Sequence, residues 1–101
     1  MLETFTVATF APHLRVTFRI SVDAARYLEV TLIEATDLSS GSGGKTVGRG
    51  RPFSIVFRGP RDILLPQQIY RVEHDDIGTF DLFLVPIGPN GDGLRYEAVF
   101  N

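Results

Sequence analysis

Apolar and polar side chains alternate along most of this chain, and a period of two is the pattern of strands with one buried face. In 15–21, for example, Val16, Phe18 and Ile20 share one side, and polar residues share the other. The same alternation recurs in five further segments, 27–35, 52–59, 68–74, 79–86 and 94–101. We therefore predict an all-β fold, a small six-stranded antiparallel sandwich or barrel.

The turns between these segments support a meander of the last three strands. The sequence DDIG at 75–78 supplies Asp and Gly for a short hairpin, and GPNGDG at 88–93 offers residues that tolerate positive φ. In 79–86, Phe83 and Val85 are apolar on the second face, which predicts a central strand covered on both sides.

One short helical turn is expected near the N-terminus. The sequence TVATFAPHL begins at residue 6, where Thr6 or Thr9 is a suitable N-cap residue ahead of Pro12. The rest of the chain follows the strand period, so at most one turn of helix is predicted.

Length and composition indicate a single domain over residues 1–101 and narrow the function classes. A net charge of -2 argues against a dedicated nucleic-acid binder. The chain has no Cys, which excludes disulfides and thiolate chemistry. The first residues show neither a signal peptide nor a membrane span, and the compartment is left open.

The segment 39–51, SSGSGGKTVGRGR, resembles half of a phosphate-binding loop. Lys45 and Thr46 fit the G-K-[ST] end of that motif, but Ser39 stands where its first Gly is needed. Gly48, Gly50 and Pro52 follow where the loop requires a helix whose N-terminus holds phosphate. We predict a flexible surface loop and no cofactor.

Three other groups of polar residues are candidates for sites of chemistry. His74 lies within EHDD at 73–76, but its neighbours in a strand face the opposite side, and His13 is the only other histidine. The serines lie in no nucleophile-elbow sequence. Asp81 and Glu97 are expected to form cross-strand ion pairs with Arg71 and Arg95. No catalytic or metal-binding residue is therefore predicted.

Charge is distributed unevenly along the chain. Residues 44–61 contain only basic charges, whereas 62–101 contain seven acidic residues against two arginines. Such segments can pair internally or present opposite patches to a partner or to a second copy. Arg58 and Arg61 flank a Gly-Pro turn and can instead tie it to an acidic neighbour. The predicted interaction residues are Lys45, Arg49, Arg51, Arg58, Arg61, Glu73, Asp75 and Asp76.

Several of these strings resemble a small family of uncharacterised bacterial domains. The likeness rests on RPFSIVFRGP, LPQQIYRVEHDDIG, LFLVPIGP and RYEAVFN, and more loosely on FAPHLRVTFRI. The resemblance implies a bacterial or phage-related origin and association with phage-tail-like or collar-type fibre proteins. It implies no catalytic residues.

Two functions follow as expectations. The first is a non-catalytic structural or assembly module that contacts proteins, either other copies of itself or a fibre- or tail-like protein. An open sheet edge, or an N-terminal arm over 1–12, would add a strand to a neighbour. The alternative is a small barrel that binds a sugar or metabolite on exposed aromatic residues such as Tyr27, Tyr70 or Phe83.

Overall fold

The computed structural model describes residues 5–38, 52–91 and 93–100. The predicted loop over 39–51 lies outside these residues. Two short helical segments precede six strands, close to the segments that the alternation predicts. The elements are α1 (Val7–Phe10), η2 (Ala11–His13), β1 (Thr17–Asp23), β2 (Arg26–Asp37), β3 (Phe53–Pro60), β4 (Gln68–His74), β5 (Gly78–Asn90) and β6 (Gly93–Phe100).

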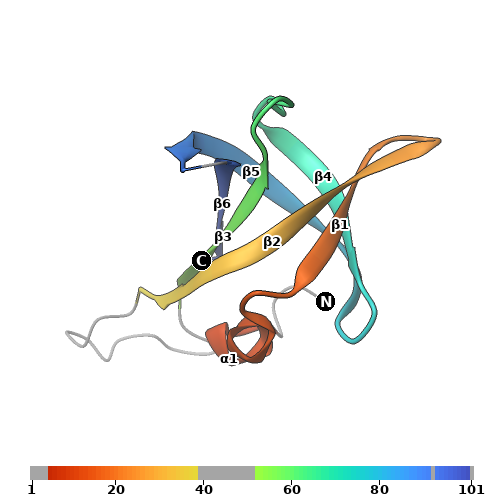
Figure 1. Ribbon diagram of the computed structural model, residues 1–101. Helices are drawn as coiled ribbons and strands as arrows, with labels where there is room; N and C mark the ends of the chain where they lie inside the picture. Colours follow the sequence, from red (N-terminus) through yellow and green to blue (C-terminus); the bar gives the residue numbers. More distant parts are fainter. Residues whose placement is uncertain (1–4, 39–51, 92, 101) are drawn as a thin grey trace.

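The six strands close into an antiparallel barrel in the order β1-β2-β3-β6-β5-β4 (Figure 1). Closure depends on the pairing of β1 with β4, in which Arg19 lies opposite Glu73 and Ile20 opposite Val72. The last three strands form the predicted meander. Of the two architectures left open by the sequence, the structure is the barrel. Closure also removes the open sheet edge that one assembly hypothesis required, since every strand has two neighbours.

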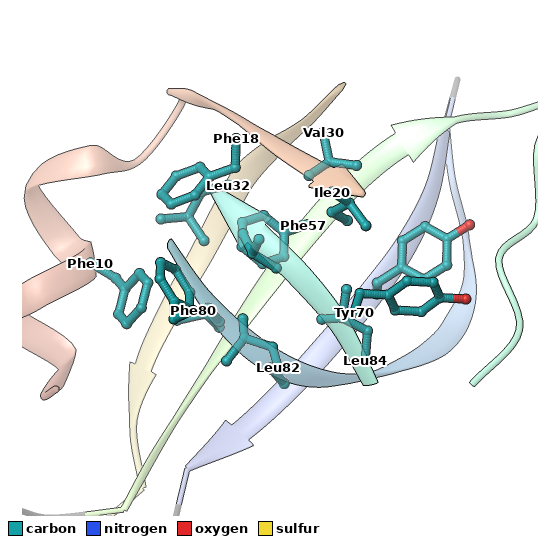
Figure 2. Close-up of a cluster of buried hydrophobic side chains, with 14 of the residues drawn as sticks. Phe10, Phe18, Ile20, Val30, Leu32, Phe57, Tyr70, Phe80, Leu82 and Leu84 are labelled. Atoms are coloured by element: carbon teal, nitrogen blue, oxygen red, sulfur yellow. The ribbon is translucent and has the colours of Figure 1, made fainter. Parts of the chain in front are cut away.

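Inward-facing side chains fill the barrel with one contiguous apolar core (Figure 2). The fully buried side chains include Phe18, Ile20, Phe57 and Tyr96. Each occupies one of the alternate strand positions whose side chains point into the barrel. A barrel of this strand number is wide enough only for side chains to fill it. The interior is therefore a packed core.

The predicted helical turn is present and covers one end of the barrel. The Thr6 hydroxyl accepts a hydrogen bond from Ala8 N at 3.2 Å, and Thr6 N donates to Thr9 Oγ1 at 3.0 Å. This capping box satisfies backbone groups that so short a helix leaves free. Phe10 is fully buried and packs against five phenylalanines, Phe5, Phe18, Phe53, Phe80 and Phe100. Residues 7–12 of the N-terminal arm hypothesised over 1–12 are helical and anchored by Phe10, so this part of the arm is not an extended strand, and residues 1–4 lie outside the described residues.

The opposite end of the barrel is covered by the connection between β3 and β4. The Tyr96 hydroxyl accepts from Leu65 N at 3.0 Å and donates to Ile63 O at 3.2 Å. The Tyr70 hydroxyl donates to Pro66 O at 2.6 Å. Leu65, within this connection, is buried in the core. Two core tyrosines thus hold residues 63–66 over the barrel end.

The outer face of β5 differs from the prediction. Phe83 is 50% exposed and Val85 is half-buried, so β5 is not covered on both sides. The reason is topological: a strand central in a barrel has neighbours on both edges, but its outer face meets solvent. None of the helices among the described residues is long and apolar enough to cross a membrane.

Candidate functional site

The predicted acidic residues lie where β4 turns into β5. Arg19 on β1 binds two of them, with Nε 3.4 Å from Glu73 Oε1 and Nη2 3.1 Å from Asp75 Oδ1. The carboxylate hydrogen bonds, first from Asp75 and then from Glu73, raise the pKa of Arg19. Asp76 is exposed beside them. The acidic segment is therefore paired with β1 rather than with Arg58 or Arg61.

His74 holds the turn that follows β4. Its side chain is buried, and its Nδ1 accepts hydrogen bonds from Asp76 N at 3.0 Å and Ile77 N at 3.4 Å. Its ring lies 4.5 Å from that of Phe18 and 4.6 Å from that of His13, measured between centroids. Burial first, and then the neighbouring His13, lower the pKa of His74. The ring thus joins the β4–β5 hairpin to the helical cover.

His13, His74 and Asp76 form the one group in the described residues that could hold a metal ion, with ligand atoms within 4.8 Å of one another. Glu73 and His74 lie on opposite faces of β4, as the strand period predicts. The sequence does not reveal that η2 brings His13 to the β4–β5 hairpin. Because His74 Nδ1 accepts two backbone hydrogen bonds, the neutral ring carries its proton on Nε2. A metal at Nε2 would require that proton to move to Nδ1, which would remove both backbone hydrogen bonds that Nδ1 accepts. The arrangement fits a hydrogen-bonded turn better than a metal centre.

The described part of the basic segment lies at the other end of the barrel. Arg58 on β3 and Arg95 on β6 are register partners, so two like charges stand side by side on the outer face. Arg61 Nη1 donates to Gly91 O in the β5–β6 turn at 3.1 Å. Within the part of the chain that the structure describes, Arg61 therefore ties its turn to a backbone carbonyl rather than to an acidic neighbour. Lys45, Arg49 and Arg51 lie outside the described residues.

Arg95 and Glu97 lie on the same strand, β6, and neither forms a cross-strand ion pair within the described residues. The Nε of Arg95 is buried and has no hydrogen-bond partner. Of the two expected pairs, only that of Arg71 with Asp81 forms, with 3.4 Å between Nε and Oδ1. The difference follows from register, because Arg71 lies opposite Asp81 on β5 whereas Arg95 lies opposite Arg58 and Gly88.

An exposed apolar pair occupies the outer face of β4 and β5. Ile69 and Phe83 are register partners and are 65% and 50% exposed. The next outward pair along these strands is the Arg71–Asp81 ion pair. The alternation hides this surface, because it assigns Phe83 to a covered face and Ile69 to the polar side of its strand.

The aromatic residues considered for ligand stacking do not gather at one place. Tyr70 is buried in the core, which corrects the expectation that it could be exposed. Tyr27 and Phe83 are exposed, but they lie on β2 and β5, which two strands separate in either direction around the barrel. These residues therefore offer no shared stacking surface.

The fold defines a class: a small closed antiparallel barrel with a packed interior, covered at one end by a helical turn and at the other by the connection over 61–67. The chain belongs to the family described as Domain of unknown function (DUF6916), whose model matches residues 5–100. This finding bears out the resemblance to an uncharacterised domain family. No curated protein and no solved structure matches the chain.

Proposed function

We propose that this domain is a non-catalytic assembly module that associates with a second copy of itself through the outer face of β4 and β5. The observation that supports this proposal is the exposed register pair Ile69–Phe83 beside the Arg71–Asp81 ion pair. Exposed large apolar side chains next to one another are typical of interaction surfaces, whereas apolar residues scattered singly over a surface need no such explanation. Val99 on the neighbouring β6 is also exposed.

The face is complementary to itself under a two-fold rotation. An axis parallel to the strands, midway between β4 and β5, places β4 of one copy over β5 of the other at the same level. Ile69 then meets Phe83 of the second copy, and Arg71 meets Asp81. Such an isologous contact satisfies apolar and charged groups on both sides at once. A perpendicular axis would break this match.

The packed interior also favours a role at the surface. The barrel core is a contiguous cluster of apolar side chains, so the chemistry available to partners lies on the outer faces and at the two ends. A finer proposal, that the assembly includes a phage-tail-like or collar-type fibre protein, is supported only by the sequence strings described above.

The test is the mass of the protein in solution from micromolar to millimolar concentration, by light scattering after size exclusion. We expect a concentration-dependent dimer that Phe83→Ser abolishes and Tyr27→Ser leaves intact, since Tyr27 is equally aromatic and exposed but lies on β2. A protein that stays monomeric throughout this range would overturn the proposal.

Charge exchange makes the test specific for the proposed axis. Arg71→Glu alone and Asp81→Arg alone should each reduce self-association, because like charges then face each other across the axis. An equimolar mixture of the two variants should recover a heterodimer, in which opposite charges face again. Failure of the mixture to associate, with both variants folded by circular dichroism, would contradict this geometry.

A further inference from the structure

The arginines that the structure describes divide into two groups. Arg19, Arg26 and Arg71 each form an ion pair with a carboxylate. Arg15, Arg58, Arg61 and Arg95 form none with any acidic residue of the described ranges, and the last three gather near the β5–β6 turn. Positive charge at this end of the barrel is therefore uncompensated within the described chain.

The backbone brings Arg58 and Arg95 side by side and holds Arg58 in place. They are direct partners in the β3–β6 register. A Cβ at Gly93 would lie 2.6 Å from Arg58 Cγ and 3.0 Å from its Cδ, so the aliphatic stem of Arg58 lies against Gly93. Like charges directly opposite in a sheet are destabilising. Folding alone therefore gives no reason for this pair.

Arg95 supplies a second, independent observation. Its side chain is half-buried, and its Nε lacks any hydrogen-bond partner although the atom is buried. A buried donor without an acceptor costs about 1–3 kcal/mol. A carboxylate accepts two parallel N–H bonds from one guanidinium, and a second guanidinium beside it stabilises the same charge.

From these contacts we infer that Arg58 and Arg95, assisted by Arg61, form a binding site for carboxylates of an acidic protein segment. A carboxylate placed between the two guanidiniums would remove their repulsion and supply an acceptor to Arg95. Two adjacent arginines suffice for isolated carboxylates, whereas nucleic-acid binding depends on many Lys and Arg contacts to successive phosphates. The site lies on β3 and β6 and does not depend on the contact proposed for β4 and β5.

Binding of a fluorescent hexaglutamate peptide, followed by anisotropy at low salt, tests this site. We expect Arg58→Gln and Arg95→Gln each to weaken binding about tenfold, as loss of a charge-assisted hydrogen bond does. Arg26→Gln is the matched control, because it removes an exposed arginine already paired with Asp23. Arg95→Lys should give an intermediate loss, because it keeps the charge but not the planar fork.

Thermal unfolding of the same variants separates binding from folding. Without peptide, Arg95→Gln should unfold at the same or a higher temperature, because it removes a repulsion and keeps most of the side-chain stem. A hexaglutamine peptide should not bind. Three results would overturn the inference. Hexaglutamine binds as tightly as hexaglutamate, or the Arg58→Gln, Arg95→Gln double variant binds hexaglutamate as tightly as the parent protein. The third is a single-stranded oligonucleotide that binds more tightly than hexaglutamate.

Discussion

Gly93 begins β6 at the point where the Arg58 side chain crosses from β3. A Cβ at this position would lie 2.6 Å from both Arg58 Cγ and Gly59 O, and the second of these is backbone. We expect Gly93→Ala to destabilise the protein by about 1–3 kcal/mol, because the two strands must move apart to admit a methyl group. Urea unfolding followed by circular dichroism measures the change.

Gly91, in the preceding turn, is the control for this prediction. It adopts φ 57° with open space around it, so its requirement is conformational rather than steric. Asn tolerates this left-handed conformation. Gly91→Asn should therefore change the free energy of unfolding by less than about 0.5 kcal/mol. Equal costs at both positions would show that close packing at Gly93 is not the cause.

At the scale of elements, the connection between β3 and β4 depends on the hydroxyl of Tyr96. That hydroxyl is the acceptor for the buried Leu65 N–H. Tyr96→Phe leaves this donor unsatisfied, and we expect a loss of about 1–3 kcal/mol of stability. Tyr70→Phe should cost less, because Pro66 O can turn to water. Hydrogen exchange should show faster exchange at Leu65 in Tyr96→Phe, and unchanged exchange there would refute the proposed role.

The strands and the helical turn were predictable because their signals are local. Alternation is a property of consecutive residues, and the Thr6 cap lies within one turn of its helix. Phe83 was misjudged because alternation shows that a residue is apolar without showing what covers it. The same limit concealed the Ile69–Phe83 surface, since an exposed apolar pair across two strands is visible only in the register.

At the scale of the whole molecule, contacts between distant segments decided what the sequence could not. Barrel closure depends on β1 meeting β4, and this pairing also brings Arg19 to the acidic residues after β4. The helical cover places His13 against His74, across 61 positions of the chain. The fact that His13 and His74 are the only two histidines was the one available signal, and it specified no geometry.

Burial of His74, and then its contact with His13, makes the stability of the barrel depend on pH. The pKa of His74 in the folded protein lies below its ordinary value of 6.5. The unfolded chain therefore takes up the proton first, and stability is full above about pH 6.5 and declines as pH falls below it. Hydrogen bonding first from Ala25 N and then from Arg26 lowers the pKa of Asp23 below 3.8. The stability that Asp23 contributes is therefore lost only in stronger acid than the stability contributed by His74. Urea midpoints between pH 7.5 and 4.5 should fall steadily for the parent protein. His74→Asn, whose Oδ1 can accept the same backbone hydrogen bonds, should flatten this dependence, and an unchanged slope in that variant would assign the effect to other groups.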